Sequence, residues 1–285
     1  SLPPHCTMVG AWYGRARPGA KATGRATGEP HPPIADQSNP REDSVATSIW
    51  QKFAGSIADR GLAGTFKHAR MVCTRAAMQY LDTGFDRRFG TETTQIVELS
   101  NLTIASKNAK DGIYYEAIPE RVLRDMLDGL DIDYSQFTFI DFGSGKGRAM
   151  LIAADYPFRK VIGVEFAPAL HEVALSNIAR YKNPAQKCRD IQSICEDATT
   201  YELPPENIVA FLYTPFKPPV LKVVIDRLVA AFQNSPRDLV IAFYGSEPVS
   251  LQILNDTGLQ TRQLKIRHDF THPVQRLALV LRRQR

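Results

Sequence analysis

The sequence predicts an α/β fold, in which a mostly parallel sheet carries helices on both faces. From about residue 137 onward, short apolar strands alternate with helical segments at the rhythm of βαβ units. The first strand runs directly into a glycine-rich loop that opens a helix, and an acidic residue stands at the end of each of the first three strands. Because ligands of such folds bind at the carboxyl ends of the strands, these acids predict a binding site there.

Apolar patterning defines each element in turn. Expected strands are 137–141, 160–166, 191–197, a part of 207–216, and 238–245, followed by two antiparallel strands between about 259 and 283. Expected helices are 148–156, 168–181 and 218–233, with one more from about Pro119 before the first strand. Pro168 fits the first turn of its helix, where a missing N–H costs little.

The chain divides into three parts by composition. Residues 1–45 are rich in Gly, Pro, Ala and Thr without an apolar period, which predicts a flexible tail. Residues 46–90 carry two helical patterns, and the stretch 82–90, "DTGFDRRFG", has the composition of a terminating turn. We expect this helical extension to pack on the α/β domain, residues 91–285, because it is too small to fold well alone.

Composition narrows the class of protein. Hydrophobic residues make up 44% and charged residues 23%, as in a soluble globular chain. The excess positive charge behind the net +5 lies in two clusters, Lys52 to Arg88 and Arg262 to Arg285. Neither is interleaved with aromatics at a regular spacing, which favours a solvated basic face over a nucleic-acid stripe. Neither a secretory signal nor a membrane-spanning apolar run is present, and the four cysteines lack C-x-x-C spacing. These features predict a cytoplasmic protein with reduced thiols and no membrane or metal partner.

The glycine loop, "DFGSGKG", is the most informative stretch. Gly143, Gly145 and Gly147 allow positive φ and a close approach of a ligand to the backbone. The loop opens a helix, whose free N–H groups favour a carboxylate or phosphate. A P-loop would need Ser or Thr after Lys146, and the dinucleotide fingerprint would need glycine in place of Arg148. Neither pattern fits the G-x-G-x-G spacing.

Together with Asp141, Glu165 and Asp197, this loop resembles the class I S-adenosylmethionine-dependent methyltransferases. The resemblance covers about residues 91–285 and rests on three features in order, each at a strand's carboxyl end. It implies a Rossmann-like methyltransferase fold with a mostly parallel seven-stranded sheet. It also implies that the cofactor is S-adenosyl-L-methionine, which Asp141 would bind through the ammonium group, directly or through water.

The remaining cofactor contacts follow from the same resemblance. Glu165 would accept both ribose hydroxyls, since a carboxylate offers two oxygens. Phe166 would pack on the adenine, Asp197 would accept the adenine amino group, and the Ala198 amide would reach a ring nitrogen. The expected cofactor-binding residues are Tyr115, Asp141, Gly143, Ser144, Gly145, Gly147, Glu165, Phe166, Asp197 and Ala198.

The stretch "DGIYYEAIPERVL" is similar to uncharacterised bacterial methyltransferases and, more distantly, to the Dot1-like lysine methyltransferases. In those enzymes a tyrosine-containing segment before the first strand closes over the cofactor. Tyr115 is the candidate for this role, with Tyr114 or Glu116 assisting. Packing alone is the competing interpretation of these tyrosines.

The acceptor is expected beside "YTPF", residues 213–216. Amino-methylating relatives carry Asn or Asp, then Pro-Pro and an aromatic residue. Thr214 departs from that pattern, because a hydroxyl is a weaker positioning group than a carboxamide. The expected catalytic residues are Tyr115, Tyr213 and Thr214. No compact His/Asp/Glu set appears, and His171, His268 and His272 are only weak candidates for a base.

Three functions follow. The leading one is methyl transfer to a small-molecule acceptor, such as a natural product, by in-line displacement. The second is methylation of protein lysine or RNA, favoured by the Dot1-like features and the basic clusters. The third is a non-catalytic module that binds S-adenosylmethionine and a partner. The acceptor atom and the oligomeric state stay open.

Overall fold

The computed structural model describes residues 84–98, 102–112, 114–233, 235–267 and 277–282. The predictions for residues 1–45, for most of 46–90 and for His268 and His272 lie outside these ranges. No helix among the described residues is long and apolar enough to cross a membrane.

One seven-stranded sheet forms the centre of the fold, with the strand order β3-β2-β1-β4-β5-β7-β6. Its strands are β1 (Phe137–Phe142), β2 (Lys160–Glu165), β3 (Ile191–Cys195), β4 (Asn207–Leu212), β5 (Leu239–Gly245), β6 (Gln260–Leu264) and β7 (Leu277–Arg282). Strands β1 to β5 run parallel, whereas β7 is antiparallel to both β5 and β6. The predicted Rossmann-like sheet with a final antiparallel pair is therefore confirmed.

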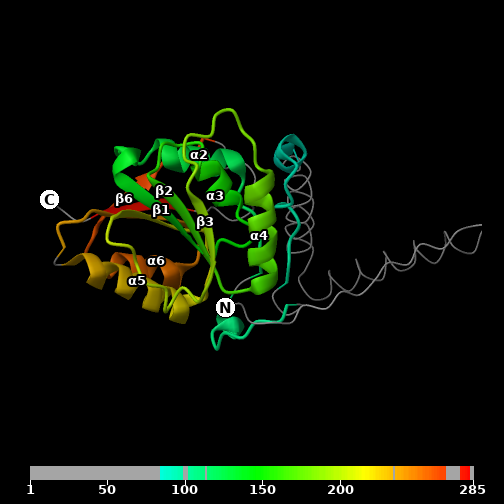
Figure 1. The fold of residues 1–285 in the computed structure, drawn as a ribbon. Coiled ribbons are helices and arrows are strands. Elements are labelled where there is room, and N and C mark those ends of the chain that lie inside the picture. Colours follow the sequence, from blue (N-terminus) through cyan, green and yellow to red (C-terminus); the bar gives the residue numbers. More distant parts are fainter. Residues whose placement is uncertain (1–83, 99–101, 113, 234, 268–276, 283–285) are drawn as a thin grey trace, which may run out of the picture. The chain divides into compact units, whose positions relative to one another are not determined.

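Helices cover both faces of this sheet (Figure 1). On one face lie α2 (Glu120–Asp128), α3 (Arg148–Ala153) and α4 (Pro168–Arg180), and on the other α5 (Pro218–Gln233) and α6 (Pro248–Asn255). Successive residues of β1 point to opposite faces: Phe139 packs in the cluster of α2 and α3, and Ile140 in the cluster of α5 and α6. Because both faces are buried, apolar side chains of β1 point to each of them, and its two polar residues, Thr138 and Asp141, are buried as well.

Two local predictions need correction. Residues 84–89 are helical, so the turn expected at 82–90 is wrong for this part. Phe85 and Phe89, four residues apart on the helix, both contact the ring of Tyr181, with ring centroids 6.1 and 4.7 Å away. This tertiary contact outweighs the turn-like composition. Helix α6 was not predicted, although Pro248 in its first turn and the buried Leu254 are typical helix features.

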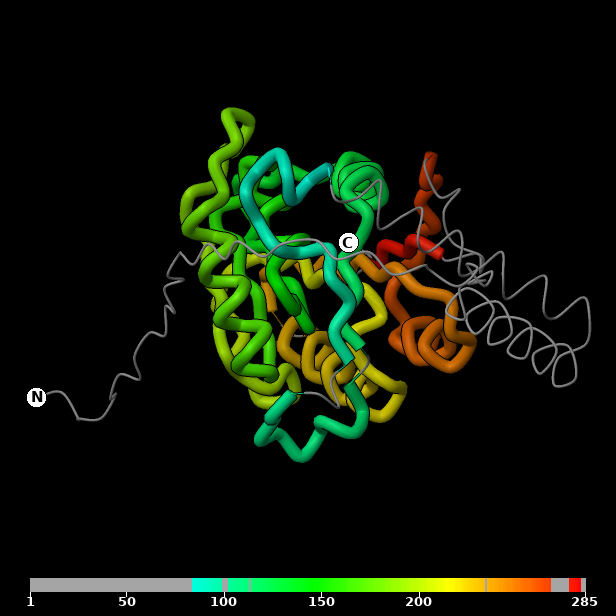
Figure 2. The backbone as a smooth tube through the Cα atoms, turned by 90° about the vertical axis from the view of Figure 1, so that its right-hand side faces the viewer, coloured from blue at the N-terminus to red at the C-terminus, as the bar shows by residue number. Residues whose placement is uncertain are grey.

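The residues between the first described helix and α2 form a long covering segment. Residues 91–98, 102–112 and 114–116 run along one side of the molecule in Figure 2, drawn in cyan to green. Val97 pairs with Tyr115 in an isolated antiparallel bridge, and Gly112 pairs in the same way with Phe216. The segment therefore contacts the loop after β4, at the carboxyl end of the sheet.

Candidate cofactor and acceptor site

The glycine loop after β1 has a left-handed backbone at three positions. Gly143, Gly145 and Gly147 have φ angles of 83°, 53° and 84°, which residues with a side chain rarely adopt. The amides of Gly143 and Ser144 donate to the carbonyl of Val164 at 2.9 and 3.1 Å, which fixes the loop against β2. The glycines predicted from spacing are therefore required by the backbone itself.

Tyr115 and Pro215 approach this loop closely. A Cβ atom placed on Gly145 would lie 2.1 Å from Cδ2 of Tyr115, and one on Gly143 would lie 2.5 Å from Cβ of Pro215. The Tyr115 hydroxyl donates to the Thr93 carbonyl at 2.7 Å, which holds the ring over the loop. Tyr115, chosen from the sequence alone, lies directly on the glycine loop.

Two acids end adjacent parallel strands beside the loop. Asp141 in β1 and Glu165 in β2 are 4% and 3% exposed. The Glu165 carboxylate accepts from the amides of Gly145 and Ala167 at 2.7 and 2.9 Å. Neither acid forms an ion pair with any residue in the described ranges. The site thus holds two buried carboxyl groups without a described cationic partner.

Burial changes the protonation of both acids. It raises the pKa of Asp141 to about 8, and the nearby charge of Glu165 adds to the effect. Burial also raises the pKa of Glu165 to about 7, although backbone hydrogen bonds to its charged form oppose the shift. The pair is therefore partly protonated at neutral pH and would ionise fully beside a cation.

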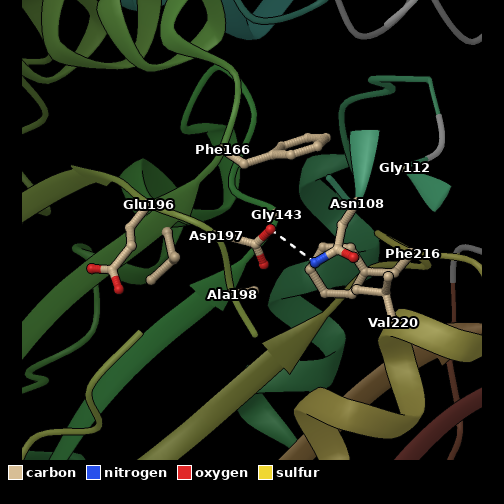
Figure 3. Close-up of a pocket in the computed structure, with 10 residues that line it drawn as sticks. Asn108, Gly112, Gly143, Phe166, Glu196, Asp197, Ala198, Phe216 and Val220 are labelled. Carbon is tan, nitrogen blue, oxygen red and sulfur yellow. Dashed lines mark hydrogen bonds between the residues drawn. The ribbon is translucent and has the colours of Figure 1, made fainter. Parts of the chain in front are cut away.

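A small pocket lies next to Asp197 (Figure 3). Its apolar walls are Val164, Phe166, Ala198, Phe216 and Val220, and Asn108, Gly112, Gly143, Glu196 and Asp197 complete the lining. Phe166 follows the acid that ends β2, and Asp197 and Ala198 follow β3, as the sequence predicts. The pocket thus brings the apolar surfaces of Phe166 and Phe216 next to the Asp197 carboxylate.

Both oxygens of the Asp197 carboxylate accept two hydrogen bonds each. Its Oδ1 accepts from the amide and hydroxyl of Thr199 at 2.8 and 2.7 Å. Its Oδ2 accepts from the Ser106 hydroxyl, and from the Asn108 carboxamide at 2.9 Å. Burial raises the pKa of Asp197, but these hydrogen bonds outweigh it and the net pKa is lowered. Asp197 is therefore ionised at neutral pH.

The residues predicted to face the acceptor lie after the end of β4. Tyr213 donates its hydroxyl to the Glu116 carboxylate at 3.3 Å, and its ring stacks on Tyr244 with centroids 5.7 Å apart. Thr214 has a φ of 40°, and its hydroxyl lies 3.4 Å from the Tyr244 carbonyl. The turn brings two tyrosines and a carboxylate together, while the Thr214 hydroxyl points to β5.

Thr214 is strained by its left-handed backbone, because β-branched side chains fit that region poorly. Asparagine tolerates it better. We expect Thr214→Asn to raise the free energy of unfolding by about 0.5–1 kcal/mol, measured by thermal or urea unfolding. Thr214→Val keeps the branching and removes the hydroxyl, so it should show no gain. A loss of stability in the asparagine variant would mean that the weak hydroxyl contact outweighs the strain.

Several residues that support the site were not predicted. The buried guanidinium of Arg148, at the start of α3, donates to the hydroxyls of Thr93 and Thr94 at 2.7 and 2.9 Å and lies 3.8 Å from the Asp86 carboxylate. Five hydrogen bonds from nearby threonines hold that carboxylate. An arginine at a helix N-terminus is unfavourable toward the dipole, and Asp86 offsets it.

A second support joins the covering segment to the glycine loop. The Asn177 side chain on α4 donates to the carbonyls of Glu92 and Lys146 at 3.0 and 2.9 Å, and accepts from the Glu92 amide at 2.8 Å. Lys146 forms an ion pair of 2.8 Å with the Glu92 carboxylate. Asn177 is the polar member of the buried helix stripe 170–174–177, and that position is its visible sequence feature.

His171 lies away from the acceptor side. Its Nδ1 is 2.8 Å from the Ser193 hydroxyl, where α4 contacts β3. The described residues contain no group of three or more His, Cys, Asp or Glu side chains that could hold a metal ion.

Comparison with known proteins gives matches only among solved structures. No family model matches the chain, and no curated protein matches its sequence. An RNA methyltransferase from Salinibacter ruber, in complex with S-adenosyl-L-homocysteine, is 18% identical; the match covers 59% of this chain and 92% of that one, with a TM-score of 0.42. Precorrin-6y C5,15-methyltransferase from Geobacter metallireducens is 15% identical, over 65% of this chain and 94% of that one, with a TM-score of 0.43.

Proposed function

We propose that the chain is an S-adenosylmethionine-dependent methyltransferase that acts on a small-molecule acceptor. The observation that carries the proposal is the buried pair of Asp141 and Glu165 beside a left-handed glycine loop. Two buried carboxyl groups with no described cationic partner favour a ligand that brings positive charge and hydroxyl donors. S-adenosylmethionine carries both, as an ammonium group and a ribose.

The residues present fit this cofactor. The Glu165 oxygens accept backbone N–H groups from Gly145 and Ala167, and the Phe166 amide also acts on this carboxylate. Of about four lone-pair directions, one remains for a ribose hydroxyl. Asp141 accepts no hydrogen bond from a described side chain, and it would hold the ammonium group. Phe166 and Ala198 line the apolar side of the pocket beside Asp197, where the adenine ring would lie once the pocket opens.

When bound, the cofactor supplies a methyl group on positively charged sulfur, which a nucleophile displaces in line. The protein's task is then to align the donor and the acceptor. Tyr115, pinned to Thr93, would hold the methionine end against the loop. Tyr213, fixed by Glu116 and Tyr244, would orient the acceptor. Thr214 would act mainly through the shape of its turn, since its hydroxyl faces the Tyr244 carbonyl.

The covering segment supports a small acceptor. Residues 102–112 and 114–116 contact the loops after three strands, at Gly145, Asp197 and Phe216. An acceptor has to enter beside this segment, which suits a small molecule or an extended side chain. The carboxylate of Glu116 next to two tyrosine rings favours an amine, so a protein lysine is the second candidate.

Calorimetric titration tests the cofactor. We expect S-adenosylmethionine and S-adenosylhomocysteine to bind, and NAD to give no heat. Mass spectrometry of reactions with primary amines, phenols and lysine peptides then tests the acceptor, with formation of S-adenosylhomocysteine as the readout. Absence of binding by either adenosyl ligand would overturn the proposal, and turnover of a lysine peptide alone would replace the small-molecule acceptor.

A further inference from the structure

We propose that in the free protein the Asn108 carboxamide donates the hydrogen bond to Asp197 that the adenine amino group donates in the complex. The cofactor would then bind by displacing the Asn108 side chain. The inference rests on the proposed function and names the residue that sets cofactor affinity and base specificity. In Figure 3, Asn108 points into the pocket and its carboxamide is hydrogen-bonded to Asp197.

The Asp197 carboxylate has no vacant position for adenine. A carboxylate offers about four lone-pair directions. Thr199 fills two of them through its amide and hydroxyl, and Ser106 and Asn108 fill the other two. An incoming amino group therefore has to replace one of these donors.

Asn108 is the donor that can leave most readily. The Thr199 contacts form a local turn directly after Asp197. The Ser106 hydroxyl donates to Asp197 and also accepts from the Asn108 amide at 3.0 Å, so it holds the backbone of the segment in place. The Asn108 carboxamide is bonded to Asp197 and, at 3.2 Å, to the Thr199 hydroxyl. Rotation of one side chain would free Oδ2 while Ser106 keeps the segment attached.

The Asn108 carboxamide and the adenine amino group are chemically similar hydrogen-bond donors. A carboxamide NH₂ and the amino group at position 6 of adenine are both planar N–H₂ donors. Asn108 lines the same pocket as Phe166 and Ala198, whose surfaces suit the base. A purine with a carbonyl at position 6 offers no amino donor there, so the hydrogen bond that Asn108 gives to Oδ2 of Asp197 would be lost without replacement. The exchange thus selects adenine.

The displaced residue is connected to the acceptor side. Three residues further along, the Asp111 carbonyl accepts from the Lys217 amide at 2.8 Å, and Gly112 pairs with Phe216. Phe216 also lines the pocket and follows the acceptor turn of Tyr213. Release of Asn108 therefore changes the wall that adenine and the acceptor turn share.

Calorimetric titration of four proteins tests the exchange: wild type, Asn108→Ala, Asp197→Ala and the double variant. We expect Asn108→Ala to bind S-adenosylhomocysteine about three- to tenfold more tightly, because no internal donor has to be displaced. In the Asp197→Ala background, the same substitution should change the affinity less than twofold. S-inosylhomocysteine, which carries the carbonyl, should gain nothing from Asn108→Ala. Asn255→Ala, on the exposed side of α6, is the matched control and should bind as wild type.

Weaker binding by Asn108→Ala would overturn the inference, because Asn108 would then contact the adenine as a partner. An unchanged affinity would equally overturn it. In either case, binding by the wild-type protein would still support the proposed cofactor. Absence of binding by all four proteins would overturn both the proposed cofactor and the displacement of Asn108. Hydrogen exchange of the wild-type protein gives a second measurement. Peptides covering 104–110 should exchange about as fast or faster with ligand than without, and marked protection would contradict displacement.

Discussion

Gly145→Ala is expected to abolish measurable cofactor binding, with a loss of at least about 100-fold in affinity. The added Cβ would lie 2.1 Å from the Tyr115 ring, so either the ring or the loop has to move. The backbone φ of 53° adds a penalty of about 1–2 kcal/mol for any residue with a side chain. Calorimetric titration with S-adenosylhomocysteine measures the affinity, and thermal unfolding reports the strain.

Gly258→Ala is the matched control. Gly258 also has a left-handed backbone, with a φ of 69°, but a Cβ there meets nothing within 4 Å. It should share the loss of stability and keep wild-type affinity. A double variant, Gly145→Ala with Tyr115→Ala, separates the two partners of the new methyl group. Tyr115→Ala alone is the reference, because Tyr115 is itself proposed to contact the cofactor. Weaker binding by the double variant than by Tyr115→Ala would place the ligand against Gly145, whereas equal binding would mean that this glycine serves only the packing of Tyr115.

The three acids and the glycine loop could be predicted because their positions depend on short stretches of sequence. Glu165 ends β2, Asp141 is the last residue but one of β1, and Asp197 follows β3 by two residues. Parallel strands bring these carboxyl ends to one edge of the sheet. The glycine spacing predicted a left-handed loop, and the φ angles confirm it. For these residues, the position along an element determines the position in space.

The supporting contacts were not predictable in this way. Asn108 and Asp197 are 89 positions apart, and Arg148 and Thr93 are 55 apart. One pair joins the covering segment to the loop after β3, and the other joins it to the start of α3. The path of such a segment depends on tertiary packing rather than on a periodic pattern. Asn108 illustrates the limit: in the sequence it is an ordinary loop residue, and only the structure brings its carboxamide to the acid expected to bind adenine.

The second large effect concerns Asp141, whose charged carboxylate lowers the stability of the protein without ligand. Burial raises its pKa from 3.8 to about 8, so the folded state keeps a proton that the unfolded state loses. The binding of this proton stabilises the folded state fully below pH 4, and the stabilisation is lost as the pH rises through about 8. We expect Asp141→Asn, which cannot ionise, to be more stable than wild type by about 1–2 kcal/mol at pH 8. At pH 4 the two proteins should unfold alike in parallel thermal or urea melts.

Cofactor affinity should rise with pH, whereas the stability contributed by the Asp141 proton falls. The ammonium group requires the charged form of Asp141, so wild-type affinity is expected to rise between pH 6 and pH 8, with protons released on binding. Asp141→Asn should lose about 10- to 100-fold in affinity at pH 8, because a charge-assisted hydrogen bond is removed. Titrations at several pH values, each in two buffers of different ionisation enthalpy, measure both effects. If the variant gained stability and kept its affinity, the buried acid would have no part in holding the ammonium group. A destabilising acid whose removal abolishes binding is the pattern expected of a residue that the ligand, not the fold, requires.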